Sequence, residues 1–140
     1  MDNIRLTYEV EGGDLTQAGE ASAQVKQTLR KLGFDPDTIR RVSVCMYEGE
    51  INMVIHADGG TATVDIGLSD ITITLADQGP GIPDIDQAMQ AGYTTAGEVA
   101  RDLGFGAGMG LPNIKKYTDQ MDIQTEVGKG TVMTMTVLVK

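Results

Sequence analysis

One stretch of the chain has the composition of an anion-binding loop. Residues 104–113 read Gly-Phe-Gly-Ala-Gly-Met-Gly-Leu-Pro-Asn, so glycine recurs at every second position from Gly104 to Gly110. Glycine lets a ligand approach the backbone closely, and a helix starting behind it offers unpaired N–H groups and partial positive charge. This combination is typical of a phosphate site, although a glycine-rich run is more often simply a flexible loop.

Two familiar phosphate motifs do not fit this sequence. The dinucleotide fingerprint needs a third glycine, but Met109 or Leu111 stands at that position, depending on the frame. The Walker pattern needs Ser or Thr after glycine and lysine, whereas Gly130 follows Gly128-Lys129. If the run holds phosphate, it belongs to a third kind of nucleotide site.

A second set of polar residues lies on a predicted helix. Glu48, Asn52 and His56 are spaced four apart in an otherwise apolar segment, which places them on one helix face. Such side chains are costly to bury without partners, so this face either meets solvent or serves a site. The core face of the same helix is expected to carry Val44, Ile51 and Ile55.

The chemistry of a phosphate ligand gives these side chains possible roles. Mg²⁺ takes oxygen ligands, and the Asn52 amide can supply one beside phosphates and water. Glu48 can accept a proton from an attacking hydroxyl, and Glu50, two residues on, faces away from Asn52. The lone histidine, His56, is equally well explained as a helix-surface or capping residue.

Asp77 ends a hydrophobic strand and precedes Gly79 and Gly81. A carboxylate at such a position can accept a hydrogen bond from an exocyclic amine, such as that of adenine, and the glycines would let a flat base lie against the backbone. The alternative is a turn-forming aspartate, which is common.

Composition limits the class of protein. The length suits one domain, residues 1–140, and the net charge of -9 argues against nucleic acid and anionic membranes as partners. No apolar run is long enough to span a bilayer and no signal-peptide pattern is visible, so we expect a cytoplasmic protein. The single cysteine, Cys45, is expected to be a small core residue.

Hydrophobic periodicity predicts an α+β fold. Alternating strands are expected at 4–10, 61–68, 71–75, 121–125 and 131–139, and helices at 16–32, 35–57, 85–91 and about 110–117. The segment 92–103 has weak periodicity and is predicted to be mobile. This order favours a two-layer sandwich in which a mixed, mostly antiparallel sheet carries its helices on one face.

The polar helix face, taken with the glycine motifs, resembles the GHKL ATPase family, whose nucleotide site is called the Bergerat fold. Glu48, Asn52 and His56 match its N box, Glu-x3-Asn-x3-His. Asp77 with its two glycines matches the first glycine box, the run 104–111 matches the second, and Thr131 matches a Gly-Thr near the last strand. The motifs follow in the right order over nearly the whole chain.

Within that family the chain is similar to the small bacterial anti-sigma and switch-protein serine kinases. The segments that carry this likeness are 77–82, Ala88, 92–95, 106–111 and Thr118-Asp119. The resemblance implies that Glu48 is the general base, that Asn52 holds Mg²⁺, and that Asp77 and Thr131 recognise adenine. It assigns nucleotide contacts to Asn52, His56, Asp77, Gly79, Gly81, Ile82, Gly104, Gly106, Ala107, Gly108, Met109, Gly110, Leu111 and Thr131.

The resemblance also implies partners. A kinase of this kind uses ATP and Mg²⁺ to phosphorylate Ser or Thr of a STAS-type antagonist protein, regulates a sigma factor or signalling partner, and often forms a homodimer. The lid, residues 94–105, is longer than expected for the switch kinases. An ATP-responsive anti-sigma or switch module that binds without phosphotransfer therefore remains the alternative.

Overall fold

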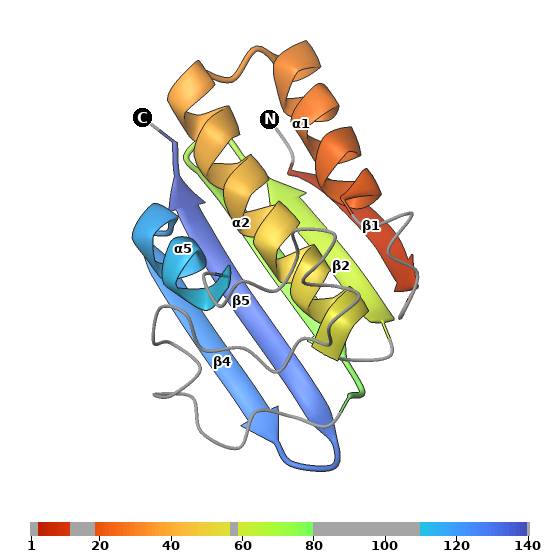
Figure 1. The fold of residues 1–140 in the computed structure, drawn as a ribbon. Coiled ribbons are helices and arrows are strands. Elements are labelled where there is room, and N and C mark those ends of the chain that lie inside the picture. Colours follow the sequence, from red (N-terminus) through yellow and green to blue (C-terminus); the bar gives the residue numbers. More distant parts are fainter. Residues whose placement is uncertain (1–2, 12–18, 57–58, 80–109, 140) are drawn as a thin grey trace.

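The fold is a sheet covered on one face by helices (Figure 1). The computed structural model describes residues 3–11, 19–56, 59–79 and 110–139. The strands are β1 (Ile4–Glu11), β2 (Gly59–Ile66), β3 (Asp70–Asp77), β4 (Gln120–Glu126) and β5 (Gly130–Leu138). The helices are α1 (Glu20–Leu32), α2 (Pro36–His56) and α5 (Gly110–Tyr117). The expected helix at 85–91 and the lid lie outside the described residues.

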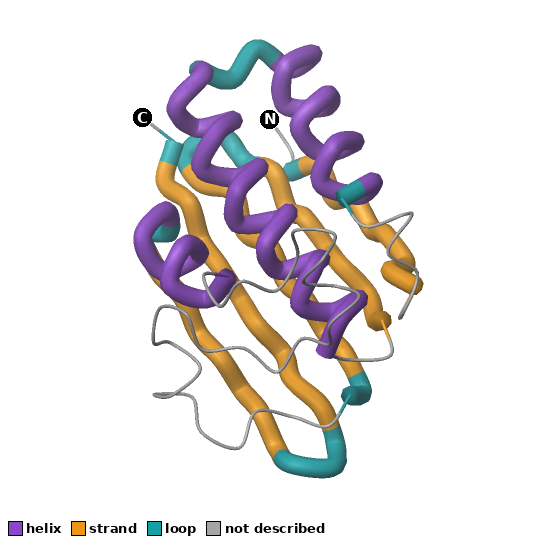
Figure 2. The backbone as a smooth tube through the Cα atoms, in the orientation of Figure 1, coloured by secondary structure: helices purple, strands orange, loops and turns teal. Residues whose placement is uncertain are grey.

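The strand order is β1-β2-β3-β5-β4. Every pairing among the described strands is antiparallel. The mostly antiparallel sheet that we expected is confirmed, and the strand order explains why no parallel pairing occurs among the described strands. Strands β3 and β4 run in the same direction, but β5 lies between them, so the parallel relation is never expressed as a pairing. Figure 2 shows the three described helices on the same side of this sheet, with α2 between α1 and α5.

Strand alternation builds the two layers, as the sequence predicts. The inward residues of the central strands β2, β3 and β5 are fully or nearly fully buried, among them Val64, Ile73 and Met135. Most outward residues are polar, with Val132 and Leu138 as exposed apolar exceptions on β5. One row of threonines runs from Thr63 through Thr74 to Thr134 across the three central strands. The core therefore lies between the helices and one face of the sheet.

Local sequence signals set the helix ends. Gly33 adopts a left-handed conformation with φ 85°, and its N–H donates back to carbonyls of the last turn of α1, as expected for a C-cap glycine. The Asp35 carboxylate accepts hydrogen bonds from the Thr38 N–H at 3.0 Å and from the Thr38 hydroxyl at 2.6 Å, which caps α2 as predicted. The helix expected from Thr16 is described from Glu20 onward.

The prediction of the core face of α2 is confirmed at Ile51, which is buried, and wrong at Val44, while the side chain of Ile55 lies outside the described residues. The main hydrophobic cluster takes six residues from this helix, namely Ile39, Val42, Cys45, Met46, Met53 and Val54. Val44 is only partly buried, and Ile51 is buried without belonging to that cluster. The helix is apolar around much of its circumference, so the sequence pattern does not distinguish the face that meets the sheet.

Candidate functional site

Helices α2 and α5 meet along a seam, which we define by three contacts from Arg41, Cys45 and Glu48 of α2. Glu48 accepts a hydrogen bond from the Asn113 side-chain amide, with 3.3 Å between Nδ2 and Oε1. One turn earlier on α2, the Cys45 thiol lies 3.8 Å from the carbonyl oxygen of Ile114. Ile114 itself is fully buried. The seam thus fixes the candidate base against the helix that follows the glycine-rich run.

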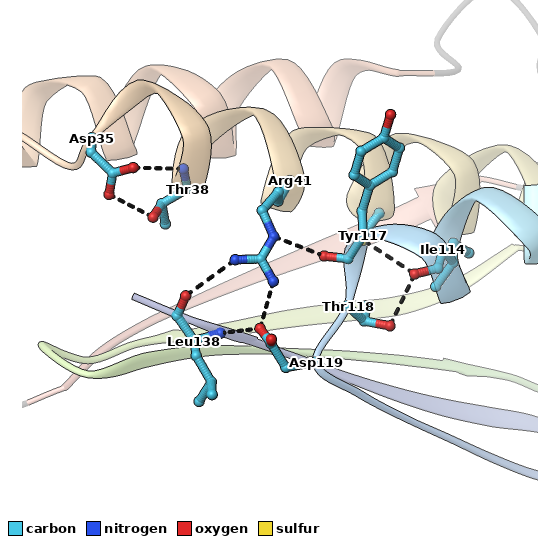
Figure 3. Close-up of polar contacts among 9 residues, drawn as sticks. Asp35, Thr38, Arg41, Ile114, Tyr117, Thr118, Asp119 and Leu138 are labelled. Atoms are coloured by element: carbon cyan, nitrogen blue, oxygen red, sulfur yellow. Dashed lines mark hydrogen bonds and ion pairs between the residues drawn. The ribbon is translucent and has the colours of Figure 1, made fainter. Parts of the chain in front are cut away.

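Arg41 makes the contacts at the other end of the seam (Figure 3). Its guanidinium donates to the Tyr117 carbonyl at 3.2 Å, to the Leu138 carbonyl at 3.4 Å and to the Asp119 carboxylate at 2.5 Å. Asp119 also accepts the Leu138 N–H at 2.7 Å. Arg41 therefore ties the C-terminal end of α5 to the end of β5, and its side chain is only 13% exposed.

Asp77 has a defined hydrogen-bonding environment at the end of β3. Its Oδ1 accepts the N–H of Gly79 at 2.9 Å and that of Thr131 at 3.2 Å. Thr131 is buried, and its hydroxyl lies 2.9 Å from the hydroxyl of Thr125. The structure thus brings together Asp77, Gly79 and Thr131, which the sequence had connected only through motif order.

Glycines of the two neighbouring strands, Gly60 of β2 and Gly130 of β5, closely approach the backbone at Ala76 and Asp77. A Cβ at Gly130 would lie 2.2 Å from the Asp77 carbonyl oxygen, and a Cβ at Gly60 would lie 2.2 Å from that of Ala76. Both glycines have positive φ, 130° and 157°. Larger residues at either position would displace the strand end that carries the Asp77 carboxylate.

The polar face of α2 lies at the same end of the sheet as Asp77. A Cβ at Gly60 would lie 2.6 Å from Met53 Cε and 3.0 Å from Asp77 Cα, so the C-terminal half of α2 and the end of β3 flank the same glycine. Asn52 precedes Met53 and is partly buried, as is Glu48. The predicted magnesium ligand and the predicted adenine-recognising residue therefore belong to one region of the molecule.

Glu50 has a role that the sequence did not indicate. Its carboxylate accepts the backbone N–H groups of Gly19 at 3.1 Å, Ala21 at 3.2 Å and Ser22 at 3.0 Å, and the residue is 3% exposed. It therefore caps the first turn of α1 from a neighbouring helix and complements the helix dipole. Its orientation away from Asn52 agrees with the 3.6-residue helical repeat.

Burial governs the chemistry of Cys45. It raises the pKa of the thiol from 9.0 to about 12, with nearby Arg41 acting in the opposite direction. The residue has no exposed surface, as expected of a core cysteine. This thiol therefore belongs to the packing of the seam and is a poor nucleophile at neutral pH.

Several predicted site residues lie outside the described part of the chain. These are Gly81, Ile82, Gly104, Gly106, Ala107, Gly108 and Met109. Gly110 and Leu111 form the start of α5, and His56 ends α2, without a described position for the Leu111 or His56 side chain. The roles assigned to all these residues stay predictions.

Sequence comparison identifies the family. Residues 13–137 match the model of the histidine kinase-like ATPase domain. The chain belongs to this family. The membership confirms the resemblance inferred from the N box and the glycine boxes, and the α+β fold agrees with it.

Relatives with known functions show what kinds of family member this chain resembles in sequence. A serine/threonine-protein kinase, RsbT of Bacillus subtilis, is 31% identical over 110 residues, covering 76% of this chain and 77% of its own length. An anti-sigma F factor of Caldanaerobacter subterraneus is 34% identical over 110 residues, covering 74% and 73% respectively. The chain is therefore similar to small kinases and anti-sigma factors, as the motifs predicted.

Solved structures support the fold. The RsbU and RsbW domains of Rv1364c from Mycobacterium tuberculosis align with 98% of this chain at a TM-score of 0.63 and 18% identity, and the chain spans 33% of that protein. The Mycobacterial sensor histidine kinase MprB aligns at a TM-score of 0.55 and 14% identity, covering 98% of this chain and 99% of its own. Among the described helices, none is long and apolar enough to cross a membrane.

Proposed function

We propose that this chain is an ATP- and Mg²⁺-dependent protein serine/threonine kinase of a bacterial partner-switching system. The observation that carries the proposal is that two partly buried polar side chains, Glu48 and Asn52, lie one turn apart on α2, and that the segment carrying Asn52 lies beside the end of β3 at Asp77. The similarity to the RsbT kinase supports the same activity.

The residues present fit a purine nucleotide. Asp77 uses Oδ1 to accept two backbone N–H groups, which fixes the carboxylate. Within the described part of the chain, Oδ2 is then available to accept a hydrogen bond from an exocyclic amine. Thr131 borders this carboxylate and can assist through its backbone and hydroxyl. The Asn52 amide oxygen is a hard ligand of the kind Mg²⁺ takes, and the ion when bound would neutralise charge on the phosphates.

Glu48 is the proposed general base. The hydroxyl oxygen of the acceptor Ser or Thr forms a bond to the γ-phosphorus, the bond from that phosphorus to the β–γ bridging oxygen breaks, and ADP leaves. The hydroxyl proton passes to the Glu48 carboxylate. Asn52 and Asp77 hold the two ends of the nucleotide while this exchange takes place.

We further propose a STAS-type antagonist protein as the substrate and a sigma factor or signalling protein as the regulated partner. The relatives named anti-sigma F factors support a sigma factor as partner. A homodimer, a cytoplasmic location and a single catalytic domain over residues 1–140 belong to the same proposal.

The test is transfer of label. The purified protein is incubated with γ-labelled ATP, Mg²⁺ and the antagonist encoded beside it, and we expect label on a Ser or Thr of the antagonist. Unlabelled antagonist together with tight, ATP-dependent capture of a sigma factor would instead favour the second candidate, a binding module without phosphotransfer. The anti-sigma factor relatives favour this alternative over other functions.

A further inference from the structure

The geometry points to Asn113 as a positioning residue that holds the Glu48 carboxylate in the orientation needed to accept a proton. This inference rests on the proposed function, because Glu48 needs such orientation only if it acts as a base. It gives a role to Asn113, a residue just beyond Leu111, where the sequence-based assignment of contacts in this stretch ends.

The contact joins two helices at a point where both are firmly placed. Asn113 Nδ2 lies 3.3 Å from Glu48 Oε1, and both residues are partly buried. Ile114, the next residue of α5, is fully buried, and its carbonyl meets the Cys45 thiol. Asn113 therefore projects from a turn of helix whose position against α2 is set by the core.

The far end of α5 is also anchored. Arg41 donates to the Tyr117 carbonyl and pairs with Asp119 directly beyond the helix. Along α2, residues 41, 45 and 48 contact residues 117, 114 and 113 of α5, respectively, so the residue numbers rise on one helix as they fall on the other. The two helices thus run antiparallel along the seam, and Asn113 is the member of the seam that reaches the candidate base.

An amide suits this position chemically. A lysine or arginine facing Glu48 would form an ion pair and oppose protonation of the carboxylate, whereas a neutral amide orients it and leaves its charge in place. Asn113 engages one carboxylate oxygen, and the second oxygen can then accept the proton of the acceptor hydroxyl. A fixed carboxylate rotamer also avoids the loss of rate that follows from misplacing a reacting group.

The central test compares Asn113→Leu with the matched control Lys115→Leu, an exposed position on the same helix. Single-turnover transfer to the antagonist and calorimetric ATP binding with Mg²⁺ are measured for both variants and the wild type. We expect Asn113→Leu to lower the transfer rate on the order of tenfold and to change ATP affinity by less than about twofold. Lys115→Leu should match the wild type in both measurements.

A double-mutant cycle separates positioning from a general structural role. If Asn113 acts through Glu48, Asn113→Leu should have no further effect on the residual rate of Glu48→Gln. The inference is overturned if the same loss of rate appears in both backgrounds, or if Asn113→Leu weakens ATP binding while transfer from bound ATP is unchanged.

A second measurement does not depend on catalysis. The side-chain amide protons of Asn113 are assigned by NMR in the wild-type protein and followed in Glu48→Gln and Glu50→Gln. We expect Glu48→Gln to shift them and Glu50→Gln to leave them in place, because only Glu48 contacts this amide in the described structure. Unaltered amide signals in Glu48→Gln would overturn the inference even in an active kinase. Absence of transfer in the wild type would instead refute the proposed function.

Discussion

The carboxylates of Glu48 and Glu50, separated by one residue on α2, have different hydrogen-bond partners on different helices. Glu48 is partly buried and faces α5, where it meets an amide. Glu50 is buried and accepts three backbone N–H groups at the start of α1. Two residues correspond to about 200° around a helix, so adjacent acidic positions reach different neighbours. The chemical roles of these glutamates can therefore be separated by isosteric substitution.

Glu48→Gln should abolish most phosphotransfer while keeping nucleotide binding, since the amide cannot accept the proton. Loss of a general base typically lowers the rate by roughly 10²- to 10⁴-fold. Glu50→Gln should leave transfer by the folded protein intact but lower the free energy of unfolding by about 1–3 kcal/mol, because a charged cap is lost. Transfer rates and urea unfolding of both variants check this pair, and a reversed pattern would assign the base to Glu50.

Cys45 gives a prediction about pH. Burial raises the pKa of its thiol to about 12, so the folded protein favours the neutral form more strongly than the unfolded chain does. The stability that this preference contributes is fully present below pH 9, the ordinary range of the thiol, and declines as pH rises from about 9 toward 12.

Urea unfolding of the wild type and Cys45→Ala at pH 8 and above pH 9 checks this decline, which should be smaller in the variant. The burial that causes it is checked by thiol labelling at pH 8, with Cys45→Ala as the unreactive blank. Native protein should react slowly with a disulfide reagent, and urea should restore the rate of a free cysteine. Rapid labelling of the native protein would show that the seam opens at this position.

At the scale of elements, α5 is a short helix that depends on its neighbours for its position. Helices of this length are marginal in isolation, so tertiary contacts must hold them in place. The seam supplies such contacts at Arg41, Cys45 and Glu48, and the buried Ile114 adds apolar packing. The orientation of α5 thus follows from side chains of α2.

Arg41→Met should destabilise the protein by about 2 kcal/mol, because it leaves the Tyr117 carbonyl and the Asp119 carboxylate without this donor. The matched control is Arg5→Met, which removes an ion pair to Asp65 from a side chain that is 71% exposed. Solvent screens such a pair, and we expect no measurable change. Urea unfolding midpoints of the two variants test the contrast, and equal losses would contradict it.

Much of the fold could be predicted because its signals are local. Strand alternation, the Gly33 C-cap and the Asp35 N-cap each depend on residues close in sequence, and the structure confirms them. The candidate site was harder to predict from the sequence. Motif order linked Asp77 to Thr131, but nothing in the spacing of an arginine, a cysteine and a glutamate predicts that they meet α5.

The partly wrong assignment of the core face of α2, which failed at Val44, has the same physical origin. Val44 and Ile51 are as apolar as Val42 and Met53, so the helix carries hydrophobic residues on more than the side that meets the sheet. Which side is buried depends on the packing of β2, β3 and β5, and that information is distributed over the whole chain. Glu50 illustrates the same limit, because its partners lie about thirty residues away.

At the scale of the whole molecule, the proposed ligand should stabilise the entire fold. The residues proposed to contact it come from α2, β3 and β5, so binding would link both layers of the sandwich. A ligand that binds only the folded state raises the free energy of unfolding by about 2.7 kcal/mol at a hundred times its Kd. Thermal unfolding with ATP and Mg²⁺ should therefore show a higher midpoint than unfolding of the protein alone.

Asn52→Ala should remove the part of this stabilisation that depends on magnesium, because it deletes the proposed oxygen ligand. Asp77→Asn should instead weaken stabilisation by ATP both with and without Mg²⁺, since the amide is a poorer acceptor for the exocyclic amine and can present a donor to it. GTP serves as the comparison, because its base presents a carbonyl where adenine presents the amine. The wild type should be stabilised less by GTP than by ATP. Equal midpoints with the two nucleotides would rule out Asp77 as the residue that selects adenine.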